Sequence, residues 1–389
     1  MTSFPPALVL KGSFGLSPKG CQLRNALIGV QYVASFGLII GATFMYLQNY
    51  YMQNTPLGYD KDEIIITNMN NNIRKSRDAF ASQVKSFSGI EEVTYAEMLL
   101  SSQDQYMGWG RKYRDKDIQF QCLPVEPSFL KVMNVKISEG RDFREEDKAK
   151  RYGTFVFNER ARTEYGLEIG SLIDSMEIVG FMPDVKFASF RTEVTPMAFF
   201  VWGTNNWGNQ PNYAYIKVKA GSDLRGAMQH VKTTLQSFDP EYPFNVRFFD
   251  EVLNGLYEKE RSLSSLITLF SLIAIFISVV GVFGLVVFDS EYRKKEIGIR
   301  KVLGSTTEEI IVMFNKTYIR ILCVCFVLGA PIAGYVVHRW LENFAYKTPM
   351  YWWVYLIAFA IIAVITILTV TFQNWRAANE NPVHSIKNE

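Results

Sequence analysis

Four long apolar runs limit what this chain can fold into more than any other feature of its sequence. The first run, residues 26–47, contains no charged residue, and the others cover residues 263–288, 317–337 and 354–372. A helix of about 20 apolar residues is long enough to cross the hydrocarbon core of a bilayer. The first run is too long for the apolar region of a signal peptide, and no small-residue cleavage site follows it. The runs therefore predict four transmembrane helices, the first over residues 26–48.

Residues 49–260, between the first two runs, have the mixed composition of a soluble domain. In residues 213–219, small and β-branched apolar residues alternate with more polar ones, a period of two that is typical of a half-buried strand. Apolar residues at helical spacing predict helices near residues 73–87 and 224–238, the second capped by Ser222. Helices that bracket strands indicate an α+β domain of two lobes, with a mainly β insertion at about 120–210. The other expected strands are residues 64–67, 118–122, 154–157, 176–181 and 198–202.

Lysine and arginine are unevenly distributed over the segments that flank the runs. Residues 1–25 contain three, the loop 289–316 contains six, and the loop 338–353 contains two. Because cytoplasmic loops carry an excess of Lys and Arg, we expect a cytoplasmic lead-in over residues 1–25 and both termini in the cytoplasm. The sequence thus predicts a membrane protein with four transmembrane α-helices and a large extracytoplasmic α+β domain inserted between the first and second spans.

The loop after the second run holds a short basic segment, residues 291–304. Gly304 supplies a helix stop, and Ser305 with Glu308 is expected to form the capping box of the next helix. Such a helix either lies in the membrane interface, in accord with the charge asymmetry, or presents charge to a cytoplasmic partner. Its basic face holds Arg293, Lys294, Ile297, Arg300 and Lys301, and another face holds Ile299, Val302 and Leu303.

Residues 250–288 are expected to form one continuous helix. Its ~39 residues would span about 58 Å, which is about twice what a bilayer core requires. The excess predicts a stalk outside the membrane, paired with residues 48–53.

Two further sets of residues are candidates for contacts. Gly37 and Gly41 form a Gly-x-x-x-Gly pair that lets another helix approach closely. The loops 105–110 and 202–208 combine glycine with large aromatic side chains, which either anchor a partner or substrate or fold back on their own domain. The aromatic candidates are Tyr106, Trp109, Trp202 and Trp207.

Several classes of chemistry lack a sequence signal. No Gly-x-x-x-x-Gly-Lys-Ser/Thr motif occurs, so we expect no ATP bound through a P-loop of this chain. The spans contain no Asp, Glu or Lys and one Arg, Arg320, which argues against ion-coupled transport. The three histidines are scattered, so we expect no metal site. The sequence shows no nucleophile–base pair that would indicate catalysis. A net charge of +3 gives no indication of nucleic-acid binding.

One stretch carries a family resemblance. Residues 295–304, with Asn381-Pro382-Val383 near the C-terminus, resemble the signature of FtsX/MacB-type ABC-transporter permeases, and the resemblance extends over nearly the whole chain. It implies a MacB-like periplasmic core domain over residues 49–260 and an FtsX-like permease domain over residues 261–389. The signature residues are Lys295, Glu296, Ile297, Gly298, Ile299, Arg300, Lys301, Val302, Leu303 and Gly304.

The resemblance also implies partners. In that family the helix at residues 293–304 docks on a cytoplasmic ATPase dimer, which binds ATP and Mg, so this chain is expected to hold no cofactor and to be non-catalytic. A second permease half or copy, membrane lipid, and a periplasmic or outer-membrane protein are further expected partners in the bacterial inner membrane. Residues 6–12 resemble the lead-in to the C-terminal half of double-length permeases. The chain is therefore expected to be either a separate subunit or half of a longer one, in a homodimer or a heterodimer.

Three functions follow. The first is an ABC permease subunit that transmits ATP-driven motion to its periplasmic domain, which relatives use for export, lipoprotein release, sensing or control of cell-wall hydrolases. The second is an extracytoplasmic sensor or receptor without an ATPase. The third, a membrane-anchored enzyme, is disfavoured because no catalytic constellation is present.

Overall fold

The computed structural model describes residues 18–101, 107–186, 190–205, 210–255, 257–292, 299–300 and 303–378. The chain forms two compact units. The helical unit comprises Met1–Gln53, Glu260–Asn343 and Lys347–Glu389. The α+β unit comprises Asn54–Lys259 together with Phe344–Tyr346.

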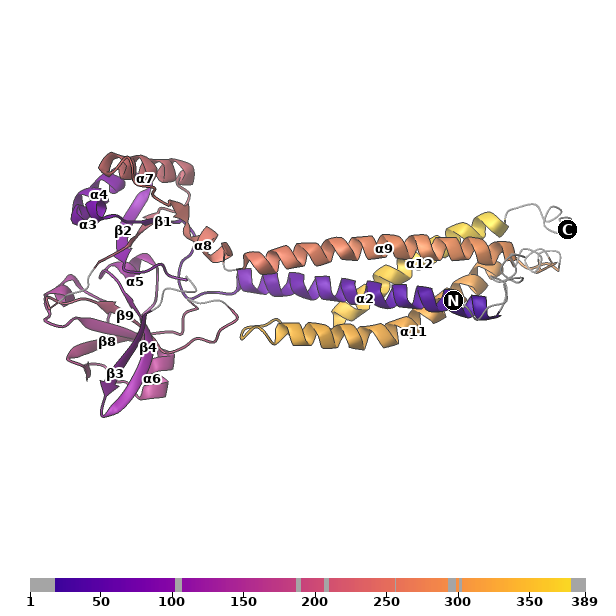
Figure 1. Cartoon of the computed structure of the whole chain (residues 1–389), viewed down its shortest axis with the longest axis horizontal. Helices are drawn as coiled ribbons and strands as arrows, with labels where there is room; N and C mark the ends of the chain where they lie inside the picture. The colour runs from indigo at the N-terminus through magenta and orange to yellow at the C-terminus, as the bar shows by residue number, and fades with distance from the viewer. Residues whose placement is uncertain are drawn as a thin grey trace, which may run out of the picture. The chain divides into compact units, whose positions relative to one another are not determined.

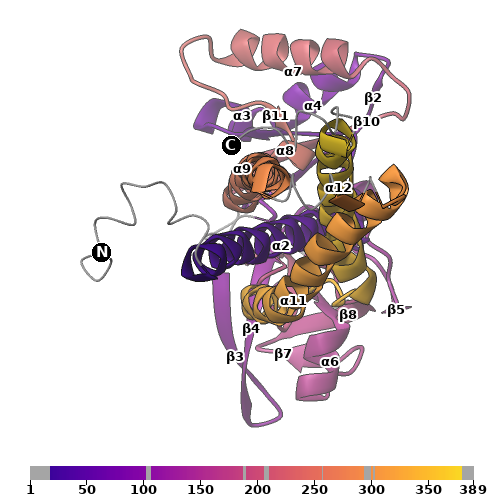
Figure 2. The same cartoon turned by 90° about the vertical axis from the view of Figure 1, so that its right-hand side faces the viewer.

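Four long helices of the helical unit run side by side, as Figures 1 and 2 show from the side and near their ends. They enclose an apolar core to which Tyr32, Phe36, Leu322 and Ala358 contribute fully buried side chains. Each helix contains a stretch long and apolar enough to span a membrane, so the prediction of four spans is confirmed for the described residues. The helices are α2 (Pro18–Asn54), α9 (Glu258–Tyr292), α11 (Thr307–Leu341) and α12 (Trp352–Ala378).

The expected continuous helix over residues 250–288 is wrong. Helix α8 (Phe249–Gly255) ends before α9 begins at Glu258. Gly255 lowers helix propensity at this point. Tyr257 forms a turn, in which its N–H donates to the carbonyl of Asn254 (3.1 Å), and its hydroxyl accepts a hydrogen bond from the N–H of Phe190 (3.0 Å). Helices α8 and α9 are therefore two separate elements joined by a turn.

Two helix caps lie one residue later than expected. Gly304 has a φ of 96°, and the N–H of Ser305 donates to the carbonyl of Arg300 (2.9 Å), which closes the preceding turn. Thr306 is consequently the N-cap of α11 and forms the capping box with Glu309, in place of Ser305 with Glu308. In the α+β unit, Asp223 rather than Ser222 caps α7 because its carboxylate accepts from two backbone N–H groups.

The first sheet of the α+β unit is antiparallel, with strand order β11-β1-β10-β2. Helices α3, α4 and α7 lie on one face (Figure 1) and bury a core with Phe80, Val84, Val231 and Leu235. The strands are β1 (Ile64–Asn68), β2 (Ile90–Ala96), β10 (Tyr213–Val218) and β11 (Arg247–Phe248), and the helices are α3 (Asn71–Lys75), α4 (Arg77–Lys85) and α7 (Leu224–Phe238).

The second sheet is formed by the chain between β2 and β10, with strand order β3-β4-β9-β6-β8-β5 and β7 paired to β8. All six predicted strands are present in the two sheets, but β2, β3 and the two-residue strands β5, β7 and β11 were not predicted. Because β3 begins at Met107, the β insertion begins earlier than residue 120. The strands are β3 (Met107–Tyr113), β4 (Lys116–Pro124), β5 (Glu139–Gly140), β6 (Thr154–Asn158), β7 (Leu172–Ile173), β8 (Met176–Met182) and β9 (Met197–Val201). Three short helices accompany them: α5 (Phe129–Val132), η2 (Glu145–Ala149) and α6 (Glu159–Tyr165).

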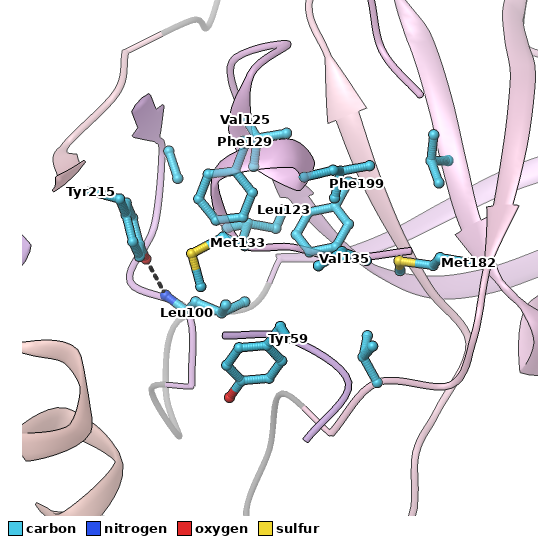
Figure 3. Close-up of a cluster of buried hydrophobic side chains, with 14 of the residues drawn as sticks. Tyr59, Leu100, Leu123, Val125, Phe129, Met133, Val135, Met182, Phe199 and Tyr215 are labelled. Carbon is cyan, nitrogen blue, oxygen red and sulfur yellow. Dashed lines mark hydrogen bonds between the residues drawn. The ribbon is translucent and has the colours of Figure 1, made fainter. Parts of the chain in front are cut away.

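A shared core joins the two sheets, and Tyr215 is its main polar link (Figure 3). The Tyr215 ring packs edge-on against Phe129, with 5.1 Å between ring centroids. Its fully buried hydroxyl accepts from the N–H of Leu100 (2.7 Å) and lies 3.2 Å from the carbonyl of Met98, to which it donates. This hydroxyl fixes the segment in which the chain leaves the first sheet for the second.

We predict that Tyr215→Phe lowers the free energy of unfolding of the 54–259 fragment by about 1–3 kcal/mol, because it leaves a buried N–H and a buried carbonyl without this partner. Urea unfolding followed by fluorescence measures the change. Tyr152→Phe, at a partly exposed ring, is the matched control. Equal unfolding midpoints for the two variants would contradict the role given to Tyr215.

Candidate functional site

The segment between α9 and α11, residues 293–306, is called the corner segment below. Ile299 and Arg300 are helical, the N–H of Leu303 donates to the carbonyl of Ile299 (3.0 Å), and Gly304 ends the turn. Ile299 is 56% exposed and Leu303 is 80% exposed. Two apolar side chains beside the exposed Arg300 form a surface that a protein partner can cover. The remaining predicted residues of this site lie outside the described part of the chain: Arg293, Lys294, Lys295, Glu296, Ile297, Gly298, Lys301 and Val302.

The corner segment is fixed to the start of α11. The Thr306 hydroxyl accepts from the N–H of Glu309 (3.3 Å), and the Glu309 carboxylate accepts from the N–H of Thr306 (3.1 Å). One and two turns further along α11, Ile310 and Phe314 are buried in the core of the helical unit. The end of the corner segment is therefore joined to the packed core through a capped helix end.

Hydroxyl groups join α2 to α9. The hydroxyls of Ser35 and Ser278 are 2.8 Å apart, and the Ser271 hydroxyl lies 3.0 Å from the carbonyl of Leu38 and 2.7 Å from that of Ile267 on its own helix. The amide of Gln31 donates to the carbonyl of Ile277 (3.4 Å). This seam was not predicted from the sequence, because the same run also contains Ser264, Ser265 and Thr268, and nothing local marks which hydroxyls face another helix.

A small cavity of about 10 Å³ adjoins this seam. The Tyr32 and Thr366 hydroxyls in its wall are hydrogen bonded to each other at 3.0 Å, as Ser35 and Ser278 are, so these groups already have partners within the chain. Its lining residues are Tyr32, Ser35, Ile275, Ser278, Val279, Val282, Ile362, Ile365, Thr366 and Thr369.

Gly37 and Gly41 do not bring helices together within this chain. A Cβ atom at either position would meet nothing within 4 Å, because both point away from the packed spans. The close approach occurs instead at Gly329 on α11, where an added Cβ would lie 3.4 Å from the backbone of Val33 on α2. A glycine pair in the sequence does not show which face of a helix is packed.

The predicted aromatic contact loops are only partly described. Trp109 is not on a loop: it lies on β3, is 9% exposed, and packs against Phe200 with 5.3 Å between ring centroids. Its glycine neighbours Gly108 and Gly110, which suggested a turn, occupy the exposed face of the strand. Trp202 stacks on the same cluster (Trp109–Trp202, 5.9 Å). Tyr106 and Trp207 lie outside the described residues.

The Trp202 indole N–H points to the carboxylate of Glu97 at 3.4 Å. Burial raises the pKa of Glu97, and this hydrogen bond opposes the shift. In the described ranges, no group of three His, Cys, Asp or Glu side chains is placed to hold a metal ion. The residues around Trp109 therefore form a packed core, to which the Trp202–Glu97 hydrogen bond is a polar contact.

Comparison with known proteins matches two family models. Residues 28–234 match the MacB-like periplasmic core domain, and residues 268–382 match the FtsX-like permease C-terminal model. The macrolide export ATP-binding/permease protein MacB of Chromobacterium violaceum is 23% identical over 230 residues, which are 56% of this chain and 35% of that protein. MacB of Escherichia coli K12 is 23% identical over 233 residues, again 56% of this chain and 35% of the relative. The chain thus spans about a third of the length of these curated relatives.

Two solved structures are similar to part of the chain. The periplasmic region of MacB from Actinobacillus actinomycetemcomitans has a TM-score of 0.37 and 14% identity, with 51% of this chain and 94% of that chain covered. The extracellular domain of the transporter YknZ from Gram-positive bacteria has a TM-score of 0.34 and 11% identity, with 47% of this chain and 99% of that chain covered.

We predict that Trp109→Ala lowers the free energy of unfolding of the 54–259 fragment by about 3–5 kcal/mol, because it opens a cavity among buried rings. Trp202→Ala should have a smaller effect, since this ring is only half-buried. Guanidinium unfolding of the two variants tests the order. If Trp109→Ala unfolded like the unaltered fragment, Trp109 would be a surface residue and its assignment to the core would be wrong.

Proposed function

Because this chain belongs to the FtsX/MacB-type permeases of ABC transporters, we propose that it transmits the motion of a separate ATPase to its α+β unit. The ATPase, as a dimer, binds ATP and Mg, and this chain is a non-catalytic membrane subunit. The proposal is supported by the family models, which cover both units, and by the corner segment.

The ATPase is assigned to a partner because the sequence given contains no P-loop motif. The curated relatives are named as ATP-binding/permease proteins, and this chain matches about a third of their length. The region that matches the periplasmic model contains no nucleotide-binding signature. An ATPase partner would supply the free energy of ATP hydrolysis.

The observation that carries the proposal is the exposure of Ile299 and Leu303 at the corner segment. Apolar side chains at the centre of a contact, with charged residues at its rim, are the usual composition of a protein–protein interface. Arg300 beside them adds a positive charge, which would favour an acidic groove on the partner. The Thr306 cap then passes the partner's movement to α11.

Helix α9 supplies the second route. Its 35 residues extend from Glu258 to Tyr292, about 52 Å at 1.5 Å per residue. Its C-terminal end leads into the corner segment, and its first two residues belong to the α+β unit. Because the helix is interrupted at Tyr257, movement of α9 would reach the α+β unit through this turn and not along one continuous helix.

The proposed location is the bacterial inner membrane, with both termini cytoplasmic and the α+β unit periplasmic. The proposed assembly includes a second permease copy or half and the surrounding lipid, and a periplasmic or outer-membrane protein is the further partner. Export, lipoprotein release and sensing all remain compatible with this mechanism, because the residues described select no substrate.

We predict that Arg300→Glu with Lys301→Glu reduces stimulation of the co-purified ATPase at least about tenfold, because like charges would face each other at a desolvated contact. ATP hydrolysis by the complex in nanodiscs measures the effect, and the amount of chain in the membrane fraction shows that insertion is intact. The matched control is Lys112→Glu with Lys116→Glu, a double reversal in the β3–β4 hairpin. Equal ATPase rates in the two double variants would leave the corner segment as an interface helix only.

A separate prediction concerns orientation. In a variant without native cysteines, an impermeant maleimide added to intact spheroplasts should label Lys112→Cys and spare Glu308→Cys, as the distribution of Lys and Arg indicates. Both positions are exposed, so their chemical access is similar. Lysis should make Glu308→Cys reactive. Labelling of Glu308→Cys before lysis would reverse the proposed topology.

A further inference from the structure

Several segments that connect the α+β unit to the spans make contacts with one loop after β8. We infer that Lys186 and residues 190–194, called the junction below, are the coupling element through which movement of the spans enters the second sheet. All residues of the junction and the residues that contact it belong to the α+β unit. The inference rests on the proposed function, since it specifies where the transmitted motion arrives.

The connection to α9 contacts the junction through Tyr257. The N–H of Phe190 donates to the Tyr257 hydroxyl at 3.0 Å, and the two rings pack edge-to-face with 6.2 Å between centroids. Tyr257 is the residue directly before α9, so a rotation of that helix moves this hydroxyl. Phe190 is buried, so it must either follow this movement or lose packing contacts.

The connection between α11 and α12 contacts the same residue from Phe344–Tyr346. The N–H of Tyr346 donates to the carbonyl of Phe190 (3.1 Å), and the N–H of Val194 donates to the Tyr346 hydroxyl (3.3 Å). The Phe190 and Tyr346 rings are 5.9 Å apart, edge-to-face. The Arg191 guanidinium lies over the Phe344 ring at 5.2 Å. A loop between two spans is thus bound to the domain by both backbone and ring contacts.

The connection from α2 reaches the junction at Leu57, whose carbonyl accepts from the N–H of Lys186 (2.9 Å). The adjacent Gly58 has a φ of 91°, and a side chain there would overlap Val185, so the two backbones approach closely. The Lys186 ammonium lies 5.2 Å from the centre of the Phe190 ring and 4.7 Å from that of Tyr346. Burial lowers the pKa of Lys186, in agreement with its position between two aromatic rings.

Lys186, the first residue of the junction, lies four residues after the end of β8 at Met182. This strand pairs with β5, β6 and β7, so it is bonded to more neighbours than any other strand of the second sheet among the described residues. A displacement of the junction would therefore act on β8, and β8 is hydrogen bonded to three other strands that would move with it. The contacts with α9, with α11–α12 and with α2 converge on an element that distributes motion over the sheet.

The test uses the full chain with its co-purified ATPase in nanodiscs and hydrogen–deuterium exchange with and without ATP and vanadate. The junction variant is Tyr257→Phe with Tyr346→Phe, which keeps both rings and removes the two hydroxyls that accept from Phe190 and Val194. The matched control is Tyr165→Phe, which removes a hydroxyl that donates to the carbonyl of Gln119 elsewhere in the α+β unit.

In the unaltered complex we expect nucleotide to change exchange across residues 176–182. In the junction variant that change should fall at least about twofold while ATP hydrolysis stays within about twofold of normal, and exchange at residues 190 and 194 should rise about 2- to 10-fold without nucleotide. The control should behave like the unaltered complex. A full response of residues 176–182 in the junction variant would overturn the inference and leave the proposed function intact. No response to nucleotide anywhere in the unaltered α+β unit would overturn both.

Discussion

Inside a bilayer every backbone N–H and carbonyl must find its partner within the protein, and the helical unit is organised by this requirement. Its spans are continuous α-helices, and α11 includes Pro331 without ending. Among the described residues, the irregular backbone that connects the spans lies at Gly304 and Ser305, at the turn of Tyr257 and between α11 and α12. Those are the places where the molecule can change shape without exposing unbonded groups to lipid.

The α+β unit has a different requirement. Water can form hydrogen bonds with its backbone, but its two sheets must be held together. A shared apolar core does so, with the Tyr215 hydroxyl bonded to the chain as it crosses between the sheets. The junction extends this core to the segments that lead to the spans. The two units have separate apolar cores, and the contacts of the junction all lie within the α+β unit.

The spans were predictable because a long apolar run has one stable outcome in a bilayer. Alternation predicted the strand at residues 213–219, and short apolar stretches indicated the other five strands. Strand β2 was missed because two glutamates interrupt its pattern, and β3 because glycines flank Trp109. The break before α9 depends on a bond from Tyr257 to Phe190, 67 residues earlier in the chain. No local pattern carries that contact, and the same holds for the junction and the hydroxyl seam. The corner segment, by contrast, was proposed as a site from its basic and apolar residues alone, and its role stays a prediction.

The bond made by Ser271 has a consequence for how α9 can travel. Its hydroxyl is within reach of the carbonyl of Leu38 on α2 and of its own helix at Ile267. If α9 slides along α2, the Ser271 hydroxyl loses the first acceptor and keeps the second, so this hydroxyl is not left unsatisfied. The cost of an unsatisfied hydroxyl, about 1–3 kcal/mol in protein interiors, is avoided at every position along the path. Ser271 therefore aligns the two helices without opposing their displacement, whereas the Ser35–Ser278 and Gln31–Ile277 hydrogen bonds of the seam would have to break.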